Sequence, residues 1–200
     1  MSGNKLIVFE GGEKVGKTTQ LARAKEYLTA KGHSVILTHE PGGGDPDIRK
    51  KLLDTKGILT PEEELDLFCK DRALHITNVI QPALERGAVI LCDRFEPSTI
   101  AYQGYGRGID LTLIKRKSAE ARRGIQPDFI FLLDADPQKV LSREEATSRF
   151  DAEKLDFHTR VRQGFLVQAA DDPDHWRIID AGQPVEVVWK DIEKHLKEIL

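Results

Sequence analysis

The chain has 200 residues, enough for one compact domain with a substantial buried core. Its formal net charge of -3 provides no basic field, which argues against a long nucleic-acid partner. No apolar run approaches the roughly 18 residues of a membrane span, and no apolar leader precedes the first strand. The two cysteines are isolated and indicate no disulfide framework. We therefore expect a soluble, cytoplasmic protein.

The first predicted strand, at residues 6–9, leads directly into a glycine-rich turn that opens a helical pattern. Residues 11–18 read G-G-E-K-V-G-K-T and complete the G-x-x-x-x-G-K-[ST] pattern of a phosphate loop. In that context, Lys17 can reach β- and γ-oxygens and the Thr18 hydroxyl can bind Mg²⁺. The predicted ATP-binding residues here are Gly11, Gly12, Glu13, Lys14, Val15, Gly16, Lys17, Thr18 and Thr19.

The next segments alternate between predicted helix and predicted strand. The helical spacing after the loop ends at Gly32, and residues 34–38 read as a buried strand. Three consecutive glycines at 42–44 cannot fix their own backbone, so their surroundings or a ligand must hold them. A short helix is predicted at 48–53. A longer one runs over 61–86, with Pro61 in its first turn and Pro82 kinking or splitting its last turn.

Three further apolar runs complete the predicted sheet, at residues 88–92, 129–133 and 176–179. Most of these strands are apolar throughout rather than alternating, which is typical of a parallel sheet that helices cover on both faces. No repeat or linker marks a second domain. We therefore predict a single α/β domain over residues 1–200, a P-loop NTPase three-layer sandwich with five parallel strands and a short flap.

An acidic residue follows each predicted strand within a few positions. These residues are Glu10, Glu40, Asp93, Asp134 and Asp180. In an open parallel sheet such ends share one edge, where ligands bind. The alternative is that the acids cap the next helix, which we favour for Asp134, Asp136 and Asp180. Asp93 is the best candidate for a carboxylate near the metal, and Arg94 would lie in the same crevice, although a solvated surface pair remains the alternative.

Other motifs in the chain indicate which class of P-loop protein this is, and so which molecule receives the γ-phosphoryl group. A switch GTPase needs a late N-K-x-D, yet the only Asn-Lys pair is at residues 4–5, and a mechanical ATPase needs a larger chain. A small-molecule kinase fits better. Phe68 and Arg72 lie four apart on the long helix and project from one face, which suits a nucleobase reader, although a core ring and a solvated charge remain the alternative.

Together, these segments resemble the thymidylate kinase family of P-loop nucleoside monophosphate kinases, and the resemblance covers nearly all of the chain. Residues 9–20 look like the family's opening, and the E-P-G-G of 40–43 is similar to R-E-P-G-G-T. F-C-K-D-R at 68–72 resembles F-x-A-D-R. Residues 93–108 match D-R-[YF]-x-x-S-x-x-A-Y-Q-G-x-G-R-G almost completely, and D-A-G-Q at 180–183 resembles the adenine-side loop.

The resemblance implies transfer of the ATP γ-phosphoryl group to dTMP, with Mg²⁺, in an enzyme that is typically a homodimer. It implies that Phe68 stacks on thymine, that Arg72 bonds a base carbonyl and that Tyr102 crowds the 2′ position of the sugar. Arg94, with Arg49 assisting, would hold the acceptor phosphate. The remaining implied residues are Pro41 near the 5-methyl group, Thr99 and Gln103 near the base edge, Ser98 in the same site, Glu13 near the 3′-hydroxyl, and Gln183 on the adenine side.

Two phosphates must meet in line, so further cations are expected beside Lys17 and Arg94. The flap predicted at 143–151 supplies Arg143 and Arg149, and Lys14 occupies the loop position where some family members carry an arginine. We favour Arg149 over Lys14, because a lysine cannot form a planar fork. The predicted catalytic residues are Lys17, Arg94, Arg149, Arg143, Lys14 and Glu13, with Thr18 and Asp93 at the metal.

The chain departs from the family pattern at a few positions. His39 replaces the usual arginine, Gly44 replaces threonine, and Lys70 replaces alanine. These departures leave open a kinase for another nucleoside monophosphate such as dUMP, or a non-catalytic ATP-binding protein. His75, His158 and Trp189 are interpreted as packing residues without chemistry.

Overall fold

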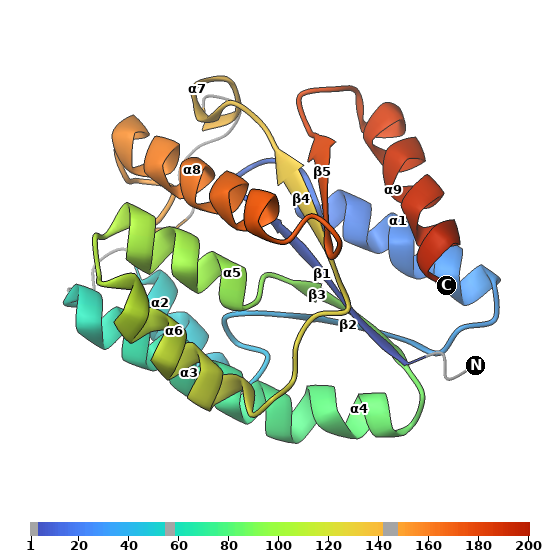
Figure 1. Ribbon diagram of the computed structural model, residues 1–200, viewed down its shortest axis with the longest axis horizontal. Coiled ribbons are helices and arrows are strands. Elements are labelled where there is room, and N and C mark those ends of the chain that lie inside the picture. The colour runs from blue at the N-terminus through green and yellow to red at the C-terminus, as the bar shows by residue number, and fades with distance from the viewer. Residues whose placement is uncertain (1–3, 55–58, 142–147) are drawn as a thin grey trace.

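In this computed structural model the described residues are 4–54, 59–141 and 148–200. Their centre is a parallel five-stranded sheet in the order β2-β3-β1-β4-β5, which Figure 1 shows between two layers of helices. The predicted three-layer α/β fold is thereby confirmed. The strands are β1 (Lys5–Gly11), β2 (Val35–His39), β3 (Val89–Asp93), β4 (Phe129–Asp134) and β5 (Trp176–Asp180).

Helices lie on both faces of the sheet (Figure 1). One face is covered by α1 (Lys17–Ala30) and α9 (Val185–Ile199). None of the helices in the described part of the chain is long and apolar enough to cross a membrane. The other helical elements are α2 (Pro46–Leu53), α3 (Pro61–His75), η1 (Ile76–Ile80), α4 (Gln81–Glu85), α5 (Glu96–Thr99), η2 (Ile100–Gly106), α6 (Leu111–Arg122), α7 (Pro137–Val140) and α8 (Leu155–Asp171).

Strand β1 joins the two hydrophobic cores. It lies between β3 and β4, and its side chains alternate between the two faces of the sheet. Leu6 and Val8 enter the core under α8 and the π-helical segments, whereas Ile7 and Phe9 enter the core under α1 and α9. All four side chains are completely buried. A strand that is covered on both faces needs an unbroken apolar sequence, which explains why the run at 6–9 predicted it.

The helix predicted over 61–86 is present but changes its winding near its end. It begins with a capping box between Thr60 and Glu63, with Pro61 in the first turn as predicted. The prolyl ring lacks an N–H, and ahead of Pro82 the helix widens into the π-helical segment η1, where the N–H of Gln81 bonds the carbonyl of Ile76. The proline therefore does not end the helix.

The acids that follow the strands take different roles. Asp136 caps α7, because its carboxylate accepts from the backbone N–H of Gln138 at 3.0 Å, as predicted. The same expectation is wrong for Asp134, which forms a two-pronged ion pair with Arg162 at 2.7 Å, and wrong for Asp180, which binds the turn at Gly182 and Gln183. A nearby cation or a tight turn competes successfully for these carboxylates.

Candidate active site

A cleft of about 750 Å³ opens at the carboxyl ends of β1, β2 and β3. The phosphate loop forms one wall, and α3, α5 and η2 form the other, which we call the acceptor wall because it carries the residues predicted to bind the acceptor. The predicted site residues that line it are Glu13, Lys14, Val15, Gly16, Lys17, Thr18, Thr19, Pro41, Arg49, Phe68, Arg72, Asp93, Arg94, Ser98, Thr99, Tyr102 and Gln103. The structure thus brings the predicted phosphate loop and the predicted acceptor residues around one space.

The phosphate loop is shaped by close backbone packing against β4. Gly11 has a φ of +143°, and a Cβ there would lie only 2.4 Å from the carbonyl oxygen of Leu133, so the position requires glycine. The Nζ of Lys17 donates to the carbonyls of Gly11 and Gly12 at 3.3 and 2.7 Å. Because α1 begins at Lys17, the N–H groups of its first turn lack helical partners and are suited to phosphate.

Arg94 crosses from β3 to the phosphate loop. Its backbone is left-handed, with a φ of 69°, and its Nη1 donates to the carbonyl of Gly11 at 2.8 Å. Its Nη2 donates to Glu13 at 2.9 Å, and its guanidinium lies 5.0 Å from the centre of the Tyr102 ring. Burial opposes the charge, but the surrounding Glu13, Tyr102 and Asp93 raise the pKa of Arg94 further above its ordinary value. The guanidinium is therefore a permanent cation at the centre of the cleft.

Glu13 completes this contact from the loop side. The hydroxyl of Tyr102 donates to its Oε1 at 2.6 Å, the same oxygen that accepts from Arg94. Burial alone would raise the pKa of Glu13, but Arg94, Lys17 and the Tyr102 hydroxyl together lower it to about 2. Glu13 is consequently an ionised carboxylate that ties together the loop and the acceptor wall.

Glu10 is a neighbouring carboxylate that the sequence analysis noted only as a residue at the end of a strand. It is completely buried, and its Oε1 accepts from the backbone N–H groups of Phe95 and Ser98 at 2.8 and 3.3 Å. Its Oε2 accepts from the hydroxyl of Ser98 at 2.6 Å. Burial raises the pKa of Glu10 to about 7, although Arg94 lowers it in part. Glu10 thereby anchors the segment that carries Arg94.

The cleft also holds groups that fit a divalent metal bound together with phosphates. Across the described residues, no cluster of three or more His, Cys, Asp or Glu side chains could hold an ion alone. The exposed Thr18 and the strand-end Asp93 both line the cleft. The Oδ1 of Asp93 is buried and has no hydrogen-bond partner in the described structure. An unpartnered buried carboxylate oxygen and a hydroxyl are hard oxygen ligands, which Mg²⁺ prefers.

The acceptor wall presents a ring beside a guanidinium, as predicted from the helical spacing. Phe68 is half-buried, whereas Arg72 is 1% exposed. The Nε of Arg72 donates to Glu40 and its Nη2 donates to Thr99, both at 2.9 Å. Its Nη1 is buried and has no partner among the described residues. The alternative that Arg72 is a solvated surface charge is therefore wrong, and the N–H groups of its Nη1 have no hydrogen-bond partner among the described residues.

Some predicted residues are not brought to the cleft wall. Gly11 and Gly12 belong to the loop but do not line the cleft, and Gln183 bonds Asp180 in the turn after β5. Arg149 forms an ion pair with the buried Glu64 and lies 5.4 Å from the Phe150 ring, although the adjacent Ser148, Phe150 and Asp151 do line the cleft. Arg143 lies outside the described residues, as does the first part of the predicted flap at 143–151.

Several residues of the site were missed by sequence reasoning. Glu64 is fully buried beneath the acceptor wall and accepts from Gln103 at 2.7 Å, from Arg107 and from Arg149. In the sequence it is one of three consecutive glutamates at the start of a helix, and the signal that could have found it is its position four residues before Phe68, on the same helix face. His75, interpreted as a packing residue, is completely buried and hydrogen-bonded on both ring nitrogens.

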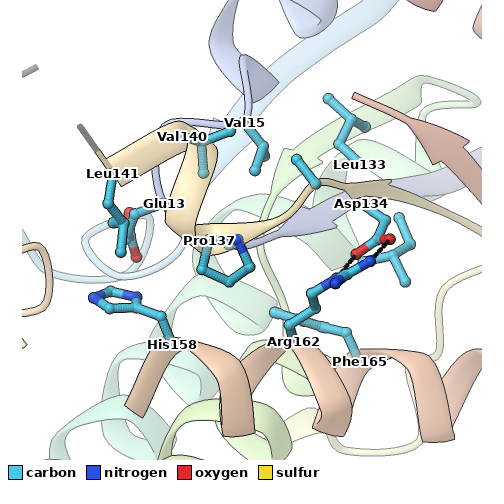
Figure 2. A pocket seen from close by; sticks show the side chains of 13 residues that line it. Glu13, Val15, Leu133, Asp134, Pro137, Val140, Leu141, His158, Arg162 and Phe165 are labelled. Carbon is cyan, nitrogen blue, oxygen red and sulfur yellow. Dashed lines mark hydrogen bonds and ion pairs between the residues drawn. The ribbon is translucent and has the colours of Figure 1, made fainter. Parts of the chain in front are cut away.

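A second, much smaller pocket lies behind the phosphate loop. Its volume of about 10 Å³ suits at most a single water molecule. Figure 2 shows Glu13 and the imidazole of His158 facing one another on one side of it, with the ion pair between Asp134 and Arg162 on the other. The 750 Å³ cleft is therefore the candidate site for nucleotides.

A parallel sheet whose central strand enters a phosphate loop, facing an acceptor wall across one cleft, defines a P-loop kinase of the nucleoside monophosphate class. A profile of the thymidylate kinase family matches residues 9–192. This chain belongs to the thymidylate kinase family.

Individual relatives support the assignment over almost the full length of the chain. A protein from Gloeobacter violaceus named thymidylate kinase is 47% identical over 193 residues, which are 93% of this chain and 91% of that protein. Another from Desulfovibrio desulfuricans is 46% identical over 195 residues, with 91% and 90% covered. The crystal structure of thymidylate kinase from Ehrlichia chaffeensis is 33% identical, with a TM-score of 0.79 and coverage of 97% and 99%.

Proposed function

We propose that this protein transfers the γ-phosphoryl group of ATP to dTMP, giving ADP and dTDP in the supply of dTTP. The observation that carries the proposal is the single cleft on which Lys17 and Arg94 converge from one side and Phe68 and Arg72 from the other. This arrangement suits a reaction that brings two anions together, because fixed cations offset the repulsion between the phosphates.

On the ATP side, the backbone N–H groups of the phosphate loop would bind the phosphates, with Lys17 at the β- and γ-oxygens. Gln183 would lie near adenine. Mg²⁺ is the metal we propose, held by Thr18 and by Asp93 either directly or through water, and when bound it would neutralise charge on the β- and γ-phosphates. The unpartnered Oδ1 of Asp93 supports this role.

On the dTMP side, Phe68 would stack on the thymine ring, and the unpartnered Nη1 of Arg72 would donate to a base carbonyl. Pro41 would contact the 5-methyl group. The other base-side residues would be Thr99 and Gln103, and their position in the lining of the same cleft supports this role. The buried position of Arg72 supports this role, because a base that left its Nη1 unpartnered would be bound more weakly.

The sugar and the acceptor phosphate would lie between this wall and the loop. Tyr102 would crowd the 2′ position, and Glu13 would approach the 3′-hydroxyl. Arg94, assisted by Arg49 and with Ser98 beside it, would bind the acceptor phosphate. The present partners of Arg94 are loop carbonyls, Ser98 and Glu13, so phosphate binding would exchange some of these contacts.

The cation that serves the transition state is proposed to be Arg149, with Arg143 and Lys14 as the other candidates. Arg149 is paired with Glu64, so it would have to leave that carboxylate in order to reach the phosphates. The Nζ of Lys14 donates to the carbonyl of Leu141 at 3.2 Å. Arg149 is favoured because a guanidinium can bridge two phosphate oxygens.

The test is an ADP-release assay with ATP, Mg²⁺ and a panel of dTMP, dUMP, dCMP, dAMP and dGMP. We expect turnover with dTMP, and about tenfold or more lower kcat/KM for dUMP because it lacks the methyl group that Pro41 would contact. Preference for another base would assign a different monophosphate kinase. ATP binding without any acceptor-dependent turnover would refute the kinase assignment. Sedimentation would test the proposed homodimer, and fractionation of the source cells the cytoplasmic location.

A further inference from the structure

A chain of buried hydrogen bonds runs behind Arg72. Its side chains come from β2, the turn that follows β2, α3 and α5, and each is at most 9% exposed. Glu40 accepts from the Nε of Arg72 at 2.9 Å through Oε2, while its Oε1 faces the Nδ1 of His75 at 3.0 Å. The Nε2 of His75 lies 2.7 Å from the hydroxyl of Thr38. The chain ends at Thr99, which accepts from the Nη2 of Arg72 at 2.9 Å.

The order of donors along this chain follows from the carboxylate. Glu40 accepts from Arg72 through Oε2, and we assign the proton between its Oε1 and Nδ1 of His75 to the imidazole, because a carboxylate oxygen is an acceptor. The other ring nitrogen, Nε2, is hydrogen-bonded to the Thr38 hydroxyl. The imidazole is completely buried, so its orientation is fixed by these two partners and by packing. The two contacts of His75 therefore define one orientation of the Glu40 carboxylate.

The glycine backbone packs closely against this ring and against α3. A Cβ at Gly43 would lie 2.6 Å from the Cδ2 and Nε2 atoms of His75, and one at Gly44 would lie 2.1 Å from the carbonyl oxygen of Asp71. Asp71 also accepts from the backbone N–H groups of Gly42 and Asp45 at 2.7 and 2.8 Å. The run of glycines is thus held against α3, with the imidazole packed directly beneath Gly43.

We propose that His75 and Thr38 are positioning residues for dTMP, which act through Glu40 to fix the orientation of the Arg72 guanidinium and of its unpartnered Nη1. With Oε1 held by His75, Glu40 meets Arg72 through the other oxygen alone. The Nη2 of Arg72 is then bound by Glu40 and Thr99, and Nη1 is left for the ligand. Without His75, the carboxylate rotates and the guanidinium loses its single orientation. The inference rests on the proposed function, since it assigns Nη1 to the base of dTMP.

The experiment compares His75→Leu with His75→Asn, whose amide N–H can replace Nδ1, and Thr38→Val with Thr38→Ser, which keeps the hydroxyl. His75→Leu and Thr38→Val should raise the KM and Kd for dTMP about tenfold, the order of one charge-assisted hydrogen bond, with kcat and the KM for ATP within about twofold. His75→Asn and Thr38→Ser should recover most of the affinity. Ile76→Val, a buried change at the next residue of the same helix, controls for general loosening of the helix and should leave both KM values unchanged.

A double-mutant cycle separates positioning from packing. In an Arg72→Lys background, Thr38→Val should change the Kd for dTMP by less than about twofold, because the planar guanidinium it orients is gone. Equal changes in both KM values, or a full effect of Thr38→Val in that background, would overturn the inference. If His75→Leu does not fold, the Thr38 pair decides the outcome. A wild-type protein without dTMP-dependent turnover would instead refute the proposed function, so the two failures are distinguishable.

Discussion

Glu10 offers the sharpest test of the electrostatics inferred for the cleft. It is completely buried between Phe95, Ser98 and the cations Arg94 and Lys17, and burial raises its pKa from 4.5 to about 7. At pH values between 4.5 and about 7, Glu10 retains its proton in the folded protein but has released it in the unfolded chain. The free energy of unfolding therefore falls as pH rises through this range. Above about pH 7 the full destabilisation by the ionised, buried Glu10 is present.

The size of the effect follows from the same two pKa values. The difference between 4.5 and about 7 corresponds to about 3 kcal/mol, of which between about 2 and 3 kcal/mol develops from pH 5 to pH 8. Glu10→Gln keeps the size of the side chain and an oxygen for the backbone N–H groups of Phe95 and Ser98, but it cannot ionise. The free energy of unfolding of the variant should therefore rise, relative to that of the wild type, by about 2 to 3 kcal/mol between pH 5 and pH 8.

Urea denaturation at pH 5 and pH 8 measures the difference directly. Glu120→Gln on the exposed face of α6 is the matched control, and it should stay within about 0.5 kcal/mol of the wild type at both pH values. A constant difference between Glu10→Gln and the wild type across this range would refute the reasoning, because Glu10 would then have the same pKa in the folded and unfolded protein.

Three further changes probe the proposed roles. Arg72→Ala should raise the KM for dTMP between about 10- and 100-fold with little change in the KM for ATP. Equal effects on both KM values would show that Arg72 does not bind the base. Arg72→Lys, which leaves a positive charge beside Glu40, is the control for misfolding. Asp93→Asn should raise the Mg²⁺ concentration for half-maximal activity at least about tenfold, whereas an unchanged requirement would contradict a role at the metal. Arg149→Ala should lower kcat about 100-fold or more, and Lys14→Ala much less; the reverse order in the same assay would assign the transition-state charge to Lys14.

The strands and the phosphate loop could be predicted because their signals are local. A parallel strand covered on both faces must be apolar at successive positions, as the run at 6–9 is, and the loop pattern is contained within residues 11–18. The spacing of Phe68 and Arg72 also predicted that they share a wall, since residues four apart lie on one helix face. These inferences needed no knowledge of contacts between distant parts of the chain.

The remaining features depend on such distant contacts. Asp134 resembled a helix cap in the sequence, but Arg162, which lies 28 residues later, takes its carboxylate. Glu64 acquires its role from Gln103, Arg107 and Arg149, which come from other segments. Its position four residues before Phe68 places Glu64 on the same face of α3, but the partners that make its burial favourable are supplied only by the fold.

The π-helical winding of η2 was likewise not predicted. In this segment the N–H of Arg107 bonds the carbonyl of Tyr102 at 2.9 Å, five residues earlier, so the helix is locally widened. Tyr102 and Gln103 lie within it and both line the cleft. The motif at 93–108 indicated which residues belong to the site, but nothing in its letters indicated this winding.

The double attachment of β1 has a mechanical consequence. Because its side chains enter both cores and it pairs with a strand on either side, the phosphate loop that follows it cannot shift without disturbing both helical layers. Phe68, Phe95 and Tyr102 on the acceptor side pack into one core alone. We therefore expect the cleft to narrow around two nucleotides by movement of the acceptor wall or of the segment that carries Arg149, while the phosphate loop stays in place.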